Sequence, residues 1–451
     1  MTDWIGETFT SRTGWDHLET LVDIENGNRM AGSEGERRAA EATRDALAEV
    51  GARNARLDEF GIQGWTRGES GVVVDGLEHD SIALPRSPSD EATGEFVDLG
   101  YGLPADFENR DIEGRVVMAA SDVPDHHDRF IHRTEKYHRA VAGGAAAFVF
   151  RNHVPGQLPP TGSVSGADGP IGEIPAVGVS KEVGLRLGRR FAGEAHASDR
   201  SSGRSPRDGE PATVRVEADV HDATSRNVHA ELGPETETRL LVTSHVDAHD
   251  IAEGAGDNGA GTAMVVELAR ALAGREDELG CTVEFVAFGA EEVGLRGSEY
   301  MAENANSEAI KAILNLDGVV NGRTLSFVTH GFDELGAAAE RVGERFDHPV
   351  EVVPKQGPHS DHWPFVRWGV PGYHVGSDTG PDRGWGHTEA DTLDKLESRT
   401  FREQAVLLTA LTVDLASDDF SVAHKESEEI AAALEAEDEA PGMKVTGDWP
   451  Y

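Results

Sequence analysis

The sequence predicts an α/β protein whose mainly parallel sheet is interrupted by an inserted, β-rich domain. From about residue 213, apolar strands alternate with amphipathic helices, an order typical of a parallel sheet covered on both faces. The region from about 61 to 212 instead contains many glycines, prolines and short β-like runs. The length of 451 residues exceeds that of one ordinary domain, so two or three domains are expected.

Helices are predicted at the start of the chain. The first lies where apolar side chains recur at helical spacing, at Trp15, Leu18, Leu21, Val22 and Ile24. The second spans 33–50 and ends before Gly51, a typical stop signal.

The middle region is expected to fold mainly as short strands. Strands are predicted at 116–120, 145–150 and 174–180, with one helix at 129–144. The polar stretch 196–211 is rich in glycine and serine and predicts an exposed loop or linker.

The alternating region supplies the main sheet. Its predicted strands are 240–245, 282–290, 312–320, 324–329, 350–353 and 370–375. Helices are predicted at 262–274 and 335–346, and a closing helix ends near 417. The remaining segment, 418–451, is acidic and is expected to be partly disordered.

The charge balance excludes several classes of partner. The chain has 82 acidic and 41 basic residues, a formal net charge of -41. Such a field repels nucleic acid and anionic membranes, because binding either requires Lys and Arg to displace counterions. The acidic residues are spread along the whole chain. We interpret them as a solvated coat suited to high salt, as in a protein from a halophile.

No targeting segment is evident in the sequence. No stretch approaches the roughly 20 apolar residues that a membrane span requires, and the N-terminus lacks the basic start and apolar core of a signal peptide. We therefore expect a soluble, cytoplasmic protein, with secretion by an unrecognised route left open.

Cys281 begins an apolar run and is expected to be a small buried hydrophobe. The oligomeric state stays open.

Side chains that can hold a metal occur where the predicted strands end. They are His245 at the end of the first strand with Asp247 and Asp257 after it, the pair Glu291 and Glu292 directly after the second, Asp317 at the end of the apolar part of the third, and His387 in a loop beyond the last. In open α/β sheets, ligands bind beyond the carboxyl ends of the strands. Four connections therefore offer histidine or carboxylate to one location.

This set of residue types fits a particular chemistry. Two histidines and three carboxylates form a nitrogen and oxygen ligand set suited to zinc, with cobalt or manganese possible. Five ligands exceed what one tetrahedral ion needs, and they suit two ions that share a carboxylate and activate one water. Glu291 and Glu292 are adjacent, so one can bind an ion while the other takes a proton from the water.

These motifs resemble the M28 family of co-catalytic zinc exopeptidases, which includes leucyl aminopeptidases and plasma glutamate carboxypeptidase-like enzymes. The resemblance spans about 213–420 and follows the family's order. Its motifs are HVD at 245–247, GDNGAG at 256–261, EE at 291–292, LDG at 316–318 and HTEADT at 387–392. It implies a phosphorylase/hydrolase-like catalytic domain at 213–423, preceded by its N-terminal helical part at 1–75 and followed by an acidic tail at 424–451.

The resemblance also implies a role for each motif residue. His245 and Asp317 would hold one zinc ion, Glu292 and His387 the other, and Asp257 would bridge them. Glu291 would be the general base. Asp247 would orient the ring of His245 from behind.

The middle region resembles a protease-associated (PA) domain, predicted here at 76–212. The resemblance rests on DIEGRVVMAA, AVAGGAAAFVFRN and IPAVGVSKEVGLRL. In the family this module caps or supports the active site, or contacts substrates and partners. SDHWPF at 360–365 also resembles a family element near the substrate pocket.

Other histidines are weaker candidates. His249 and Asp250 are interpreted as loop residues that could shape the pocket, and His359 or His362 could touch substrate. The histidines of the inserted domain are interpreted as surface residues: His126, His127, His132 and His138.

The expected function is a peptidase acting on peptide substrates, with an aminopeptidase favoured. The alternatives are a carboxypeptidase, a dipeptidase, another amidohydrolase, a glutaminyl cyclase or a non-catalytic binding protein of the same fold. A carboxypeptidase would need a cation for the terminal carboxylate, for which Arg367 and Arg383 are candidates. The intact ligand set with Glu291 argues against the binding protein, and five ligands argue against the cyclase.

Overall fold

The computed structural model describes residues 3–127, 129–191, 211–380 and 385–451. The chain divides into two compact units. The first unit comprises Met1–Ile62, Asp222–Glu437 and Tyr451, and the second comprises Gln63–His221 and Asp438–Pro450. These units are defined by contacts and do not test the domain boundaries given in the sequence analysis. Those boundaries stay predictions. Most of the predicted linker at 196–211 lies outside the described residues.

The sheet of the first unit is mainly parallel, as predicted. Its strands lie in the order β13-β12-β14-β11-β9-β10-β8. The central four, β10, β9, β11 and β14, pair in parallel, whereas β12 and β8 run antiparallel to their neighbours β14 and β10. The bounds are β8 (Pro211–Leu232), β9 (Arg239–His245), β10 (Thr282–Phe288), β11 (Ile310–Leu316), β12 (Leu325–Val328), β13 (Val350–Val353) and β14 (Gly372–Ser377).

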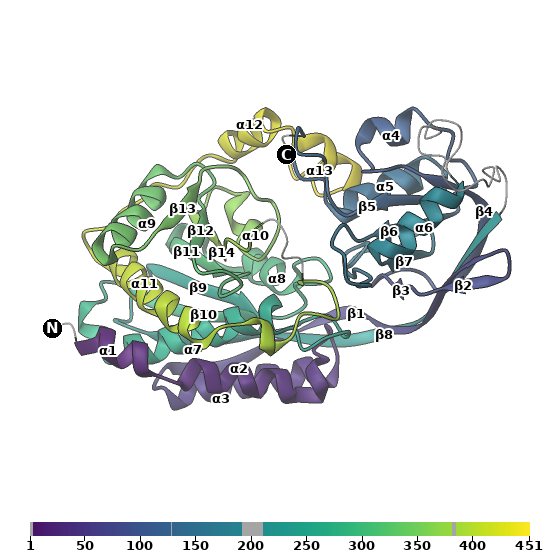
Figure 1. Ribbon diagram of the computed structural model, residues 1–451. Helices are drawn as coiled ribbons and strands as arrows, with labels where there is room; N and C mark the ends of the chain where they lie inside the picture. Colours follow the sequence, from purple (N-terminus) through teal and green to yellow (C-terminus); the bar gives the residue numbers. More distant parts are fainter. Residues whose placement is uncertain (1–2, 128, 192–210, 381–384) are drawn as a thin grey trace. The chain divides into compact units, whose positions relative to one another are not determined.

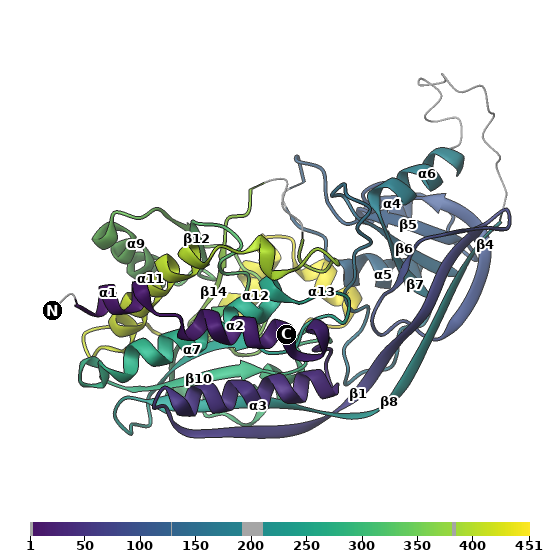
Figure 2. The same ribbon diagram turned by 60° about the horizontal axis from the view of Figure 1, so that its bottom comes forward.

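Helices cover both faces of this sheet (Figures 1 and 2). On one face, α7 (Ala260–Ala273) packs on β9, β10 and β11, because nearly all of its side chains are apolar and buried. Further helices pack on α7: α1 (Asp3–Thr10), α2 (Thr13–Asp23), α3 (Glu34–Glu49) and α11 (Ser398–Ala416).

The opposite face is covered by shorter helices. These are α8 (Arg296–Asn304) and α10 (Trp363–Val366). Phe365 and Met301 pack there against a cluster of strand residues that includes Val286 and Ile313. A further helix, α9 (Asp333–Phe346), packs against β13 and α11. With both faces covered, the strands are almost entirely apolar, and polar groups collect at their ends.

The second unit has its own sheet and core. Strands β4, β5, β6 and β7 pair in parallel, and β3 adds antiparallel to β7. The core contains Leu99, Val117, Tyr137 and Phe148 among others. The bounds are β2 (Leu77–His79), β3 (Ile82–Ala83), β4 (Asp90–Asp98), β5 (Val116–Ala120), β6 (Ala147–Arg151), β7 (Ala176–Val179), α4 (Pro104–Glu108), α5 (Arg133–Ala142) and α6 (Lys181–Phe191).

Two strands of 22 residues each belong to both units. They are β1 (Arg53–Val74) and β8, which pair with each other. The division between the units falls within both strands.

The C-terminal segment, expected to be partly disordered, forms two helices. They are α12 (Ser427–Ala436) and α13 (Ala440–Thr446). The expectation was wrong because a few apolar residues in the acidic sequence recur at helical spacing and are buried, among them Ile430, Leu434 and Met443. Glu426 and Glu429 form a capping box at the start of α12.

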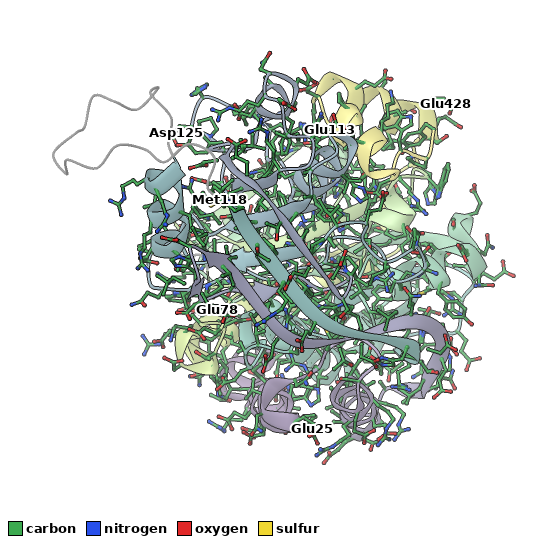
Figure 3. The ribbon with its side chains drawn as sticks, turned by 90° about the vertical axis from the view of Figure 1, so that its right-hand side faces the viewer. Glu25, Glu78, Glu113, Met118, Asp125 and Glu428 are labelled. Atoms are coloured by element: carbon green, nitrogen blue, oxygen red, sulfur yellow. The ribbon has the colours of Figure 1, made fainter. Side chains whose placement is uncertain are left out.

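Acidic side chains cover both units. Figure 3 labels five of them, all exposed: Glu25, Glu78, Glu113, Asp125 and Glu428. Cys281 is buried, as expected. Among the described helices, none is both long and apolar enough to span a membrane.

Candidate metal centre

The predicted metal-binding residues meet at the carboxyl edge of the parallel strands. His245 is the last residue of β9, and Asp317 directly follows β11. The predicted strands 282–290 and 312–320 are both shorter in the structure, so Glu291, Glu292 and Asp317 lie on loops, outside the ladder. In a parallel sheet all these strand ends point the same way, which brings the loops together.

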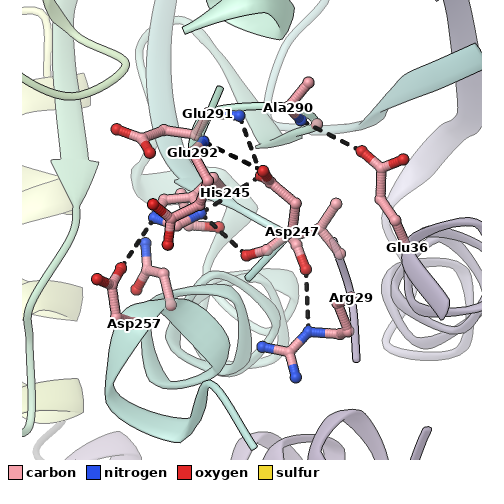
Figure 4. Close-up of polar contacts among 12 residues, drawn as sticks. Arg29, Glu36, His245, Asp247, Asp257, Ala290, Glu291 and Glu292 are labelled. Carbon is pink, nitrogen blue, oxygen red and sulfur yellow. Dashed lines mark hydrogen bonds and ion pairs between the residues drawn. The ribbon is translucent and has the colours of Figure 1, made fainter. Parts of the chain in front are cut away.

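Asp257 lies between His245 and His387, and Figure 4 shows its contact with His245. One of its carboxylate oxygens is 3.3 Å from Nε2 of His245, and the other is 3.1 Å from Nε2 of His387. Nε2 of His245 is also 3.7 Å from Asp317, and Nε2 of His387 is 3.5 Å from Glu292. The five residues therefore form two halves, with one histidine in each and Asp257 common to both.

The adjacent glutamates face different halves. Glu291 brings an oxygen within 4.8 Å of ligand atoms of His245 and Asp317, whereas Glu292 lies beside His387. Ala290, just before them, has a left-handed backbone (φ 56°). Its N–H donates to the buried carboxyl group of Glu36 at 3.2 Å (Figure 4). This contact fixes the turn from which the two glutamates diverge.

Asp247 lies behind His245. Its carboxylate accepts hydrogen bonds from the backbone N–H groups of Glu291 (3.1 Å) and Glu292 (3.2 Å). Nδ1 of His245 is 3.1 Å from the backbone oxygen of Asp247 and 3.5 Å from its carboxylate. The predicted placement of Asp247 beside the ring is thus present, and the carbonyl oxygen is the nearer acceptor. With Nδ1 on the side of Asp247, Nε2 is the ring nitrogen that faces Asp257 and Asp317.

The ionisable side chains of the centre shift one another's pKa values strongly. Burial disfavours the charge on His245, but Glu291 and the nearby aspartates outweigh it and raise the pKa of the ring well above its usual value. Burial likewise opposes ionisation of Asp257, but the adjacent rings of His245 and His387, at 3.3 and 3.1 Å, bring its pKa well below the usual value. Burial and neighbouring carboxylates raise the pKa of Glu291. Such opposed shifts in one place are typical of functional sites.

Several residues that hold the centre in place were not predicted. Asp391 accepts hydrogen bonds from the N–H groups of Gly256 (2.7 Å) and Asp257 (3.0 Å), so it fixes the shared carboxylate. It lies in HTEADT, four residues after His387, and this spacing was the only sequence signal. Burial and the charge of Asp257 raise the pKa of Asp391 to about 7.

A chain of hydrogen bonds also holds the side chain of Asp317 in place. Ser360 donates to its carboxylate at 2.6 Å and accepts from the side-chain amide of Asn315 at 2.9 Å. Asn315 in turn accepts from Thr243 at 2.7 Å. Ser360 belongs to SDHWPF, so this motif reaches the centre through Asp317.

The weaker candidates have mixed outcomes. His362 is fully buried and stacks between His330 and His374, with Nε2 3.0 Å from the oxygen of Gly357. It therefore packs in the core, and burial holds its pKa well below the usual value. His249 is buried next to Glu292. Arg383 lies outside the described residues.

The residues present fit a bound cation. Nε2 of His245 and Oε1 of Glu292 are buried and have no hydrogen-bond partner among the residues that the structure describes. A small cavity beside them is lined by Asp257, Glu292, His387 and Asp391 among others. Both groups of convergent donors lie in the first unit, and the described part of the second unit contains none. Carboxylates so close together need a positive charge among them.

Fold and site together define the class: an α/β protein with a cluster of divalent-cation donors at the carboxyl edge of its parallel strands. Residues 227–412 match the model of Peptidase family M28, and residues 90–187 match the PA domain. The chain therefore contains a region of peptidase family M28, at 227–412, and a PA domain, at 90–187.

Relatives and solved structures agree with this assignment. The chain is 25% identical over 404 residues to "Aminopeptidase YwaD" of Bacillus subtilis (strain 168), covering 85% of this chain and 80% of that protein. It is 28% identical to "Probable lipoprotein aminopeptidase LpqL" of Mycobacterium tuberculosis over 71% of this chain, but only 61% of that longer protein. The structure of BSAP, a zinc aminopeptidase from Bacillus subtilis, matches with a TM-score of 0.66 at 22% identity, covering 90% of this chain and 96% of that chain. The likeness to BSAP shows the fold of this chain.

Proposed function

We propose that this chain is a zinc-dependent aminopeptidase that uses two metal ions to release N-terminal residues from peptides. The observation that carries the proposal is the position of Asp257, whose two oxygens face His245 and His387 at 3.3 and 3.1 Å. A carboxylate shared in this way suits two neighbouring ions better than one.

Each ion would have its own side-chain donors. His245 and Asp317 would hold one ion, Glu292 and His387 would hold the other, and Asp257 would be shared by both. Nitrogen and oxygen donors in this number suit zinc, and cobalt or manganese are compatible with them. Support for zinc also comes from the likeness to BSAP, which is described as a zinc aminopeptidase.

The chain's own residues supply the proton transfers. When bound, a pair of zinc ions supplies Lewis acidity that activates water and polarises the peptide carbonyl group. Glu291, on the half of the centre that holds His245 and Asp317, accepts the proton of the attacking water and delivers it to the leaving amine. Asp247 keeps the ring of His245 and both glutamate amides in place during these steps.

A contact of Arg367 favours an aminopeptidase over a carboxypeptidase. A carboxypeptidase needs a cation for the terminal carboxylate, and Arg367 was one candidate. Its guanidinium group instead makes a two-point ion pair with Glu299, at 2.8 and 2.5 Å, and both side chains are largely buried. The charge of Arg367 is therefore neutralised by Glu299 and is not available to bind the terminal carboxylate of a substrate. The relatives named above are aminopeptidases, which agrees with this choice.

Substrates with and without a free N-terminus test the proposal. We expect the zinc-loaded protein to hydrolyse aminoacyl-anilides and unblocked dipeptides, and to lose this activity with a strong chelator. N-acetylated dipeptides should be poor substrates. Preference for the N-acetylated dipeptides would indicate the carboxypeptidase alternative, and activity that survives complete metal removal would exclude the metal mechanism.

A further inference from the structure

His249 lies inside the metal centre, whereas the sequence predicted a loop residue that could shape the pocket. It follows His245 by four positions, in the loop after β9, and is 5% exposed. Its Nε2 is 2.9 Å from Oε2 of Glu292. The rings of His249 and His387 meet edge to face, with centroids 4.6 Å apart and planes at 81°. The two rings therefore do not stack on each other.

The distances match those between ligands of one ion. One ligand atom each from His249, Glu292 and His387 lie within 4.8 Å of one another. At zinc–ligand distances of about 2.0–2.2 Å, the ligand atoms of a tetrahedral site lie roughly 3.3–3.5 Å apart. Oε2 of Glu292 is 2.9 Å from Nε2 of His249 and 3.5 Å from Nε2 of His387, values close to this range.

The loop that carries His249 is held rigidly. The buried Arg29 donates to the backbone oxygens of Val246 (3.1 Å), Glu253 (2.7 Å) and Gly254 (2.9 Å). The N–H of Ala248, next to His249, donates to the backbone oxygen of Arg29 at 3.1 Å. Both ends of the loop are therefore tied to one side chain. A ligand on a loop so fixed needs little reorganisation on binding.

We propose that His249 is a sixth metal ligand, which binds through Nε2 the same zinc ion as Glu292 and His387. The inference rests on the proposed function, because it assigns His249 to one of the two ions proposed there. With Asp257, this ion would have four protein donors, the number that a closed tetrahedral zinc site takes. The ion at His245 and Asp317 has only three, and its open position lies on the side of Glu291.

The two ions are therefore unequal. A closed site of four protein donors holds zinc more tightly than a site that keeps an open position. The ion at Glu292 and His387 binds first and organises Asp257, and the ion beside Glu291 binds second and more weakly. This order assigns the substrate-facing chemistry to the half of the centre that contains Glu291.

Zinc titration of two variants tests the ligand role. In competition with chelators of graded affinity, the unaltered protein should bind two zinc ions with distinct affinities. His249→Gln should weaken the tighter one by more than about 100-fold, beyond the roughly 10–100-fold typical of groups that only contact a ligand. The matched control is His229→Gln, since His229 is also buried and pairs with a glutamate, Glu284, at 3.0 Å. It should leave both affinities unchanged.

A crystal structure of the zinc-loaded full chain provides a readout that does not depend on a variant. We expect Nε2 of His249 at about 2.0–2.1 Å from an ion shared with His387. Two bound ions with His249 only hydrogen-bonded to Glu292 would overturn this inference and leave the proposed function standing. Equal zinc affinities of His249→Gln and His229→Gln would likewise overturn this inference and leave the proposed function standing. An unaltered protein that binds no zinc would overturn both this inference and the proposed function.

Discussion

Asp257 is the residue on which the centre depends most, because it faces both histidines while Asp391 fixes its backbone. A change at Asp257 disturbs both halves. A change at His245 mainly disturbs one. Glu291 and Glu292 allow the two halves of the centre to be tested separately, since they are adjacent in sequence and lie on different halves.

Glutamine at each position of the glutamate pair should cause a different failure. Glu291→Gln keeps size and hydrogen bonding but cannot accept a proton, so we expect both zinc ions to stay bound while turnover falls by about 10²–10⁴-fold. Glu292→Gln should loosen one ion, and added zinc should partly restore activity. Metal content and turnover are measured on the same samples. If Glu291→Gln lost metal and Glu292→Gln kept it, the roles would be reversed.

His17 should make the protein less stable in mild acid. It is buried, with Nε2 3.0 Å from Thr43, and burial together with the charge of Arg29 lowers its pKa to about 4. Between pH 6.5 and 4 the unfolded chain binds a proton that the folded chain does not, so stability falls as the pH falls through this window. By pH 5 this penalty reaches about 2 kcal/mol.

The variant His17→Gln isolates this effect, since glutamine can still contact Thr43 but does not titrate. Denaturant unfolding is compared at pH 7.5 and pH 5. The loss of stability between the two should be about 2 kcal/mol smaller in His17→Gln than in the unaltered protein. Equal losses would show that His17 is not held neutral by the fold.

Sequence alone located the donors whose positions depend on strand ends, and it missed those that depend on distant parts of the chain. His245 and Asp317 end apolar runs, so their convergence could be predicted. His249 could not, because its burial depends on Arg29, more than 200 residues earlier. The role of Asp391 depends on a hydrogen bond across 135 positions to Gly256, which no local pattern encodes.

At the scale of elements, the segment 246–254 after β9 is the most constrained part of the site. Gly254 has a left-handed backbone (φ 58°), and a Cβ there would lie 2.4 Å from the Cβ of Ala248. Arg29 fills the space inside this segment and bonds its carbonyl oxygens. The loop thus has a defined shape without regular hydrogen bonding of its own.

Removing the guanidinium group of Arg29 should open this loop. In Arg29→Met, three buried carbonyl oxygens of the loop lose a charged donor, and hydrogen bonds of this kind contribute about 1.5–3 kcal/mol each. We expect a loss of at least about 3 kcal/mol of unfolding free energy, with weaker zinc binding. The control is Arg323→Met, because Arg323 is largely exposed and pairs only with Glu403 among the ion pairs described. Equal stability of the two variants would contradict the account of the loop.

At the scale of the whole molecule, the net charge of -41 should make stability depend on salt. Repulsion among exposed carboxylates is screened over about 10 Å at 0.1 M salt and about 3 Å at 1 M. We therefore expect the thermal midpoint to rise with KCl over this range. A variant with Glu113→Gln, Asp125→Asn and Glu428→Gln, all exposed positions (Figure 3), should show a smaller rise. A midpoint independent of salt would show that the acidic surface has another purpose.

The C-terminal helix α13 has a consequence for synthesis on the ribosome. It packs on α5 within the second unit, with Met443 buried and Glu439 3.7 Å from Arg129. Its residues follow α5 by about 300 positions, so at roughly 5–20 residues per second α5 waits about 15–60 s for this partner. During that interval the surface of α5 that α13 covers is exposed, while the first unit is still being completed. A chaperone that shields this surface would matter more here than for a protein whose domains follow one another along the chain.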